Sequence, residues 1–512
     1  MDADVDPSEN QFKTQLKSYN MKIILAGYNL DTETIREFQE QNPEAKHLTP
    51  ETISAAYARI SRSPKSVDEL RGVARLEVEK ARQSNRNIVF DMGHSSVAEH
   101  AVFNIDVLGV SRLLVEEIEK FRLCSYTEKS QRYVLFKDDF HIPEEIREAG
   151  LESSFAETVR EQNRMYQELY GRLKPHVFKM HADLAADPAN RSMLEGWAKE
   201  DARYVIALAT ETQLGMTINA RNLELMLRRL AAHPLTEARD FSGKLYAATK
   251  DAAPSLIRYT EATDHDRLTR KALKDVVDAL LTKEEILKGN DACLKDESVT
   301  LVHATSHADD MVVASLIHSS SNLPLIRCME ITARLDREDK EKIIKTSLRH
   351  MKSYDAVQRE FENVNLHFEL AISASCFAQM KRHRMATIIC QDYEPALGVT
   401  MPPAISEIGM EKPFREIMAR TEETYEQLKK VCLQAAAYIL SNAHRKRVSL
   451  KINARELYHI ARLRADRHAQ WDIRAIAEEM IALGKEVMPV TLMMATGKDD
   501  FLSLHSQILT NV

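Results

Sequence analysis

Two polar segments carry the side chains best suited to binding a charged ligand, and the first is basic. It contains the run Lys381-Arg382-His383-Arg384, preceded by Gln379. Gln379 and Arg382 are three residues apart and are expected to share a helix face, as are Arg464 and His468, which are four apart. Arginine offers forked donors to a phosphate and can stack on a ring. These residues predict a site for a planar, anionic ligand; the alternative is a solvated basic helix face that pairs with nearby acids.

The second polar segment places Glu128, Ser130 and Arg132 at alternate positions. An extended backbone would point all three side chains to one side. A carboxylate, a hydroxyl and a guanidinium on one edge could read a pyrimidine and hold a phosphate. The alternative is an exposed edge with an internal Glu–Arg pair, which would contribute little to stability.

A third cluster, residues 93–100, contains two histidines and a carboxylate. Such residues can bind a metal, but their spacing is not one of the common zinc patterns, so no metal site is predicted. The plain structural interpretation is a helix that begins at Ser95 or Ser96, with Glu99 completing a capping box.

The composition is that of an ordinary globular protein long enough for two or more domains. Of 512 residues, 44% are hydrophobic and 29% charged, and the net charge of −7 gives no general reason to expect nucleic-acid binding. The six cysteines form no Cys-x-x-Cys pair, which favours a reducing cytoplasm over a disulfide framework. An acidic N-terminus and the lack of a long apolar run predict neither a secretory signal nor a membrane span.

The elements that must position these residues occur twice along the chain. Short apolar runs at 21–27 and 299–304 predict a strand near the start of each half. Alternating segments at 103–108 and 364–370 predict half-buried strands, followed by helices over 111–122 and 373–384.

A short sequence echo supports a duplication. Asn219-Ala220-Arg221-Asn222-Leu223 is repeated as Asn453-Ala454-Arg455-Glu456-Leu457, which opens a predicted helix over 453–463. The echo follows the polar segment in the same order in each half, so we interpret the chain as a tandem duplication. We expect a mobile extension (1–20), a first repeat (21–262), a helical connector (263–297) and a second repeat (298–512).

Both polar segments resemble one signature, Arg-His-Arg-x-x-Ser-x-x-Glu-x-Ser-x-Arg, of the flavin-dependent thymidylate synthases. The copy at 120–132 keeps Ser, Glu, Ser and Arg but begins Lys-Phe-Arg. The copy at 382–394 keeps Arg-His-Arg and has Thr, Cys, Asp and Glu at the other four positions. Together they make one complete set. The resemblance implies an α+β fold: two tandem family domains, mostly helical, with a small antiparallel sheet in each.

The resemblance also implies one composite nucleotide site built from both halves. Its substrate-binding residues would be Gln379, Arg382, Arg464, Glu128, Ser130, Arg132 and Arg203. The corresponding positions in the opposite halves are Glu117, Lys120, Leu230, Cys390, Asp392, Glu394 and about Ala437. Every residue lost in one half is kept in the other, so the second site should be degenerate, and its acidic residues would repel an anion.

The cofactor implied by the resemblance is FAD, with NADPH and methylenetetrahydrofolate as co-substrates. Candidate flavin contacts are His94, Ser96, Glu99, His383, Arg384, Asn453 and His468. The reaction would be reductive methylation of dUMP to dTMP, and the fused chain would form a homodimer equivalent to the family's homotetramer.

The sequence also departs from the family pattern. Thr127 stands where many members have Asn, and residues 353–356 replace the Gly-His-x-Ser region in the second half. Two alternatives therefore stay open: methylation of another pyrimidine nucleotide, or a non-catalytic nucleotide- or flavin-binding descendant of the family.

Overall fold

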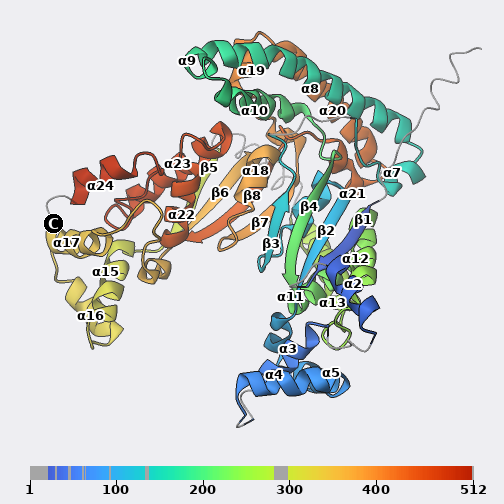
Figure 1. Ribbon diagram of the computed structural model, residues 1–512. Coiled ribbons are helices and arrows are strands. Elements are labelled where there is room, and N and C mark those ends of the chain that lie inside the picture. Colours follow the sequence, from blue (N-terminus) through green and yellow to red (C-terminus); the bar gives the residue numbers. More distant parts are fainter. Residues whose placement is uncertain are drawn as a thin grey trace, which may run out of the picture. The chain divides into compact units, whose positions relative to one another are not determined.

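The computed structural model describes residues 21–28, 32–43, 48–59, 63, 65–91, 94–132, 138–281 and 298–509 (Figure 1). The expected N-terminal extension and the end of the expected connector lie outside these residues. The chain forms two compact units. Unit 1 contains residues 1–163, 207–275 and 423–439, and unit 2 contains residues 164–206, 276–422 and 440–512.

Unit 1 is built on a four-stranded antiparallel sheet in the order β1-β2-β4-β3. The strands are β1 (Lys22–Gly27), β2 (Val102–Ser111), β3 (Cys124–Glu128) and β4 (Glu211–Asn219). Strand β2 buries alternate residues, as its sequence pattern predicts, and a register shift between Leu108 and Val110 interrupts its pairing with β4.

Some helices of this part of the chain pack against the sheet, and others pack on one another. Helix α12 packs against β1, and α3, α4 and α5 pack on one another. The helical elements of this part of the chain are α2 (Thr32–Gln41), α3 (Glu51–Arg59), α4 (Val67–Leu76), α5 (Val78–Arg86), η2 (Asn87–Asp91), η3 (Ser95–His100), α6 (Arg112–Ile118), α7 (Glu144–Glu148), α11 (Ala220–Ala231), α12 (Thr236–Thr249), α21 (Leu433–Ala436) and η8 (Ala437–Ile439).

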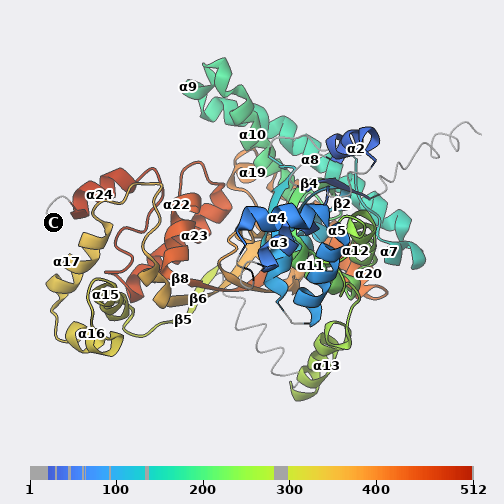
Figure 2. The same cartoon turned by 60° about the horizontal axis from the view of Figure 1, so that its bottom comes forward.

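Unit 2 repeats the same sheet in the order β5-β6-β8-β7. Its strands are β5 (Val299–Ala304), β6 (Asn365–Ser373), β7 (Thr387–Tyr393) and β8 (Arg445–Asn453). The inward residues of β6 and β8 join a hydrophobic core with α22 and α23. Helices α15, α16, α17 and α24 gather at one end of this unit (Figure 2). The predicted α+β fold with one small antiparallel sheet in each half is confirmed.

The remaining helical elements lie in unit 2 or continue from one unit into the other. Those within unit 2 are α9 (Ala182–Ala185), η4 (Pro188–Asn190), α10 (Arg191–Ala202), η5 (Arg203–Val205), α15 (Ala308–Ser319), α16 (Leu325–Thr332), α17 (Arg337–Leu348), η6 (Arg359–Asn363), α18 (Ala374–Met380), η7 (Pro395–Leu397), α19 (Pro403–Glu407), α22 (Ala454–Arg464), α23 (Trp471–Val487) and α24 (Phe501–Leu509). Those with residues in both units are α8 (Glu152–Met180), α13 (Asp264–Leu280) and α20 (Glu411–Lys429). Within the described ranges, no helix is long and apolar enough to cross a membrane.

Two predicted helices are shorter than expected. The helix predicted over 111–122 is α6, and the one predicted over 373–384 is α18, which ends at Met380. Ser111 and Ser373 are their N-caps, and each hydroxyl accepts the N–H three residues later, at 3.0 and 2.9 Å. The run from Lys381 to Arg384 therefore lies in a turn.

Each unit is completed by a segment from the other half of the sequence. In unit 2, the N–H of Ala443 donates to the carbonyl of Tyr204 at 2.9 Å. In unit 1, the N–H of Ala209 donates to the carbonyl of Tyr438 at 2.9 Å. The chain thus supplies residues 164–206 to the second sheet's unit and 423–439 to the first sheet's unit.

Each of these segments inserts a fully buried tyrosine beside an N-cap serine. The Tyr204 hydroxyl donates to Asp472 at 2.9 Å, and Ser373 donates to the same carboxylate oxygen at 2.5 Å. In unit 1, Tyr438 donates to Glu237 at 2.7 Å. A buried carboxylate needs such donors, because an unpaired buried charge is costly.

Replacing Tyr204 with Phe should lower the free energy of unfolding by about 1.5–3 kcal/mol, the usual contribution of a hydrogen bond to a charged group. Urea unfolding followed by circular dichroism would measure the change. The exposed Tyr246→Phe variant is the control and should be neutral. An equal, near-zero effect of both substitutions would show that the buried hydroxyl does not hold its segment in place.

Candidate functional site

The end of α18 and the end of α22 form a connected polar cluster in unit 2. Arg464 donates from Nε to His383 Nε2 at 3.1 Å and from a terminal nitrogen to the Gln379 carbonyl at 3.2 Å. On the other side of the ring, His383 Nδ1 lies 3.0 Å from Glu456. Because arginine can only donate, Nε2 must accept, so Nδ1 carries the proton and donates to Glu456.

This arrangement keeps His383 neutral. Burial lowers the pKa of His383 and Arg464 lowers it further, against the opposing hydrogen bond to Glu456. His383 is 2% exposed, and both ring nitrogens are used within the protein. The imidazole therefore fixes the orientation of Arg464.

A hydrogen-bonded chain joins Gln379 to the segment supplied by the first half of the sequence. Its side chain donates to Gln470 at 3.2 Å, and Gln470 donates to the Tyr204 hydroxyl at 2.7 Å. The neighbouring Arg203 is also buried and donates to the Ser375 hydroxyl at 2.9 Å. Arg203 of η5 thus contacts α18, the short helix that carries Gln379; both are predicted from the sequence to bind the nucleotide.

Both expected pairs extend past the end of their helix. Helix α18 ends at Met380, so Arg382 lies in the turn that follows it. His468 does not share a face with Arg464, because α22 ends at Arg464. In the turn, Arg382 and Arg384 are exposed on either side of the buried His383.

Asn453 begins the helix that carries this cluster. It is the N-cap of α22, and its side chain accepts the Glu456 N–H at 2.8 Å. The predicted helix over 453–463 is confirmed to within a residue. The same echo residue in unit 1, Asn219, caps α11 by accepting the Asn222 N–H at 3.0 Å.

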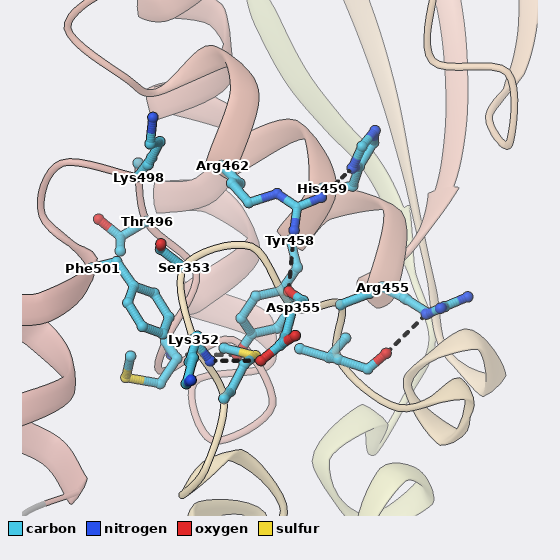
Figure 3. A pocket seen from close by; sticks show the side chains of 15 residues that line it. Lys352, Ser353, Asp355, Arg455, Tyr458, His459, Arg462, Thr496, Lys498 and Phe501 are labelled. Carbon is cyan, nitrogen blue, oxygen red and sulfur yellow. Dashed lines mark hydrogen bonds between the residues drawn. The ribbon is translucent and has the colours of Figure 1, made fainter.

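A pocket opens on the same helix (Figure 3). Its charged lining is mostly basic: Lys352, Arg455, Arg462 and Lys498, together with His459 and one acid, Asp355. Its apolar lining consists of Met351, Val357, Tyr458, Met494 and Phe501. The cavity measures about 30 Å³, room for roughly two water molecules, so it could take one anionic group rather than a whole ring system.

Two arginines of α22 shape this pocket. Arg462 donates to the carbonyl oxygens of Tyr354 and Asp355 at 2.7 and 3.1 Å, and Arg455 donates to the carbonyl of Val357 at 2.8 Å. The loop over 353–357 is therefore tied to the helix. The sequence interpretation did not select Arg455, His459 or Arg462 as site residues, although their spacing of four and three residues marks one helix face.

The corresponding positions in unit 1 pair their charges with one another. Lys120 donates to Glu117 at 2.6 Å, and His233 Nε2 lies 3.3 Å from the same carboxylate. Burial would raise the pKa of Glu117, but the His233 hydrogen bond and the Lys120 charge outweigh it and hold this pKa well below its usual range. The cation that stands in place of Arg382 is thus already paired.

The second polar segment does not form one extended edge. Strand β3 ends at Glu128, and the Arg132 N–H donates to the Ser130 hydroxyl at 3.2 Å in the turn that follows. The expectation that Glu128, Ser130 and Arg132 point the same way along a strand is therefore wrong. Glu128 itself pairs with Arg112, and its side chain is 3% exposed.

The third cluster begins a 3₁₀ helix rather than a capped α-helix. His94 precedes η3 and makes no side-chain cap, so the expected capping box is absent. Glu99 instead pairs with Arg221 of the echo segment at 2.5 Å. His94 and Ser96 are exposed, and Gly93 lies outside the described residues.

Comparisons with known proteins agree with a duplicated chain. A family model described as thymidylate synthase complementing protein matches residues 45–255 and 300–490, which confirms the predicted tandem duplication. A UPF0159 protein from Thermoplasma acidophilum is 24% identical over 506 residues, covering 90% of this chain and 98% of that protein. A flavin-dependent thymidylate synthase from Clostridium tetani is 31% identical over 214 residues, covering 41% of this chain and 82% of that enzyme. The solved UMP/dUMP methylase PolB from Streptomyces cacaoi, bound with 5-Br dUMP, is 18% identical, with a TM-score of 0.32, and covers 39% of this chain and 95% of that one.

His383 should titrate below its ordinary pKa of about 6.5 and carry its neutral-state proton on Nδ1. The unfolded chain binds the proton that charges this imidazole more tightly than the folded chain does. The fold should therefore lose stability as the pH falls below about 6.5 and His383 becomes protonated. The charged groups that face this ring are Glu456 and Arg464, with His459 beside it. Nitrogen-15 NMR of the imidazole measures both properties, and Glu456→Gln should lower the pKa further. A pKa above 6.5, or a proton on Nε2, would contradict the assigned hydrogen bonds.

Proposed function

The chain belongs to the thymidylate synthase complementing protein family, that of the flavin-dependent thymidylate synthases, and we propose that it methylates dUMP reductively to dTMP. The overall reaction transfers the methylene carbon of methylenetetrahydrofolate to C5 of the pyrimidine, and NADPH supplies the hydride equivalent. The observation that carries the proposal is the fixed arginine cluster of unit 2, in which a neutral histidine and a glutamine carbonyl orient Arg464.

The residues of this cluster suit a pyrimidine nucleotide. Arg464 and Arg203 are partly or fully buried cations, and Gln379 adds an amide beside them. Held guanidinium groups bind a phosphate and stabilise negative charge on a pyrimidine without reorganising. Arg382 is exposed next to the cluster, where a ligand can reach it. Glu128, Ser130 and Arg132 stay sequence-based candidates for nucleotide binding.

The basic pocket supports a phosphate-bearing cofactor such as FAD. The lysines and arginines that line it suit one phosphate group of such a cofactor, and the rings of the cofactor would lie outside this small cavity. Bound FAD would accept electrons from NADPH and pass them on to the pyrimidine. The candidate flavin contacts of the family pattern are His94, Ser96, Glu99, Arg384, Asn453 and His468. We assign His383 a different part, that of a positioning residue, because its ring nitrogens hold Glu456 and Arg464.

Unit 1 supports a single active nucleotide site per chain. Glu117 and Lys120, which replace a glutamine and an arginine of the binding set, neutralise one another. A phosphate would have to compete with this ion pair for the lysine.

The replacement of Gly-His-x-Ser by residues 353–356 favours the second candidate, a non-catalytic nucleotide-binding descendant of the family.

Substitution of Arg464 with Ala should weaken dUMP binding by about 10–100-fold, because a charge-assisted contact contributes roughly 1.5–3 kcal/mol. Lys120→Ala, at the degenerate position, is the matched control and should leave the affinity nearly unchanged. Calorimetry with dUMP measures both, and dTMP formation from dUMP, NADPH and methylenetetrahydrofolate tests turnover. If Lys120→Ala proves as harmful as Arg464→Ala, the active site has been assigned to the wrong residues. If dUMP binds but no dTMP forms, the non-catalytic candidate is correct.

A further inference from the structure

Two carboxylates and an imidazole meet in unit 2 just after α22. Asp466, His468 and Asp499 each offer one ligand atom, and these atoms lie within 4.8 Å of one another. Asp466 and His468 lie in the turn between α22 and α23, and Asp499 lies in the loop before α24. Their sequence spacing matches no common metal motif, so the cluster is visible only in the folded chain.

The Asp466 carboxylate is incompletely satisfied. The residue is 7% exposed, and its Oδ1 accepts the His468 N–H at 2.9 Å. Its Oδ2 is buried, and none of the residues that the structure describes donates a hydrogen bond to it. A buried carboxylate oxygen without a donor is costly, so this atom is suited to a positive ligand.

A glycine contact brings the third residue into place. A Cβ at Gly497 would lie 2.1 Å from the Ala465 carbonyl oxygen and 3.2 Å from the Asp466 nitrogen. Only glycine allows the two loops to approach this closely, and the approach places Asp499, two residues later, beside Asp466. The fold therefore holds together two carboxylates that would repel one another without a cation between them.

Arg467, the neighbouring arginine, does not replace a cation between the two carboxylates. Arg467 lies 3.0 Å from one oxygen of Asp499, but its side chain is 74% exposed. An ion pair in solvent contributes little and is screened by salt. It also leaves the buried oxygen of Asp466 without a hydrogen-bond donor among the described residues.

A second group of potential ligands, His383, Glu456 and His459, is less suited to a cation. Arg464 donates to His383 Nε2, and Arg462 lies 3.0 Å from His459 Nδ1. Two guanidinium groups thus face these ligands, and both His383 nitrogens are already used.

We propose that Asp466, His468 and Asp499 bind a divalent transition-metal ion of the Zn²⁺ type. One imidazole nitrogen and two carboxylate oxygens match the ligands of Zn²⁺, and the exposure of His468 and Asp499 leaves room for water to complete the coordination. The ion would supply the missing partner of Asp466 and tie the turn after Arg464 to the loop before α24. The proposal does not rest on the methylation activity, and His468, which is also a candidate flavin contact, keeps its second ring nitrogen for another ligand.

The test uses the full-length protein stripped of metal with a chelator. Calorimetry with ZnCl₂ should show one site per chain, and bound Zn²⁺ should raise the melting temperature. Asp499→Asn should weaken Zn²⁺ binding at least tenfold, whereas Asp500→Asn, at an exposed neighbour outside the cluster, should not change it.

Three outcomes would overturn the proposal. They are no Zn²⁺ binding by the wild-type protein, equal affinity in Asp499→Asn and wild type, and loss of binding in Glu456→Gln but not in Asp499→Asn. The last result would assign the ion to the His383 group. A melting curve of metal-free Asp499→Asn, expected to match that of the metal-free wild type, verifies that the variant is folded.

Discussion

The structure depends on two buried carboxylates that are each shared between a helix cap and a tyrosine from the other half of the sequence. Asp472 accepts from Ser373 and Tyr204 in unit 2, and Glu237 accepts from Ser111 and Tyr438 in unit 1. Burial raises the pKa of Asp472 and its hydrogen-bond donors oppose that shift. Without its tyrosine, each carboxylate would lose a donor it needs in the protein interior. Neither half of the sequence can therefore complete its own unit.

This exchange of segments also builds the candidate site. Arg203 directly precedes Tyr204 in the sequence. The hydrogen bond from the Tyr204 hydroxyl to Asp472 therefore also places Arg203 near the start of α18, where it donates to Ser375. At the other end of the same helix, Gln379 and Arg464 meet around His383. Stability and ligand binding thus share one helix. The first half of the sequence contributes to the arginine cluster of the second because it also supplies the tyrosine that unit 2 requires.

Much of the fold follows from local patterns in the sequence. Alternation of apolar and polar residues predicts β2 and β6, because successive side chains of a strand point to opposite faces of the sheet. Apolar runs predict β1 and β5. Helix ends are less visible: α18 stops at Met380, and the basic run folds into a turn that no spacing rule indicates. The pairing of Glu128 with Arg112 overrides the simple alternation of the second polar segment. These wrong predictions concern a turn and a contact between residues that are distant in the sequence, and neither follows from a local residue pattern.

The central claim is one flavin and one pyrimidine nucleotide per chain, and titration of the purified protein with FAD, monitored by visible absorption, tests it most directly. The account predicts that about one FAD binds per chain and that added dUMP then perturbs the flavin spectrum. Uptake of two equivalent flavins per chain would contradict the degeneracy of the second site. No flavin uptake, with or without dUMP, would contradict the proposed flavin-dependent reaction.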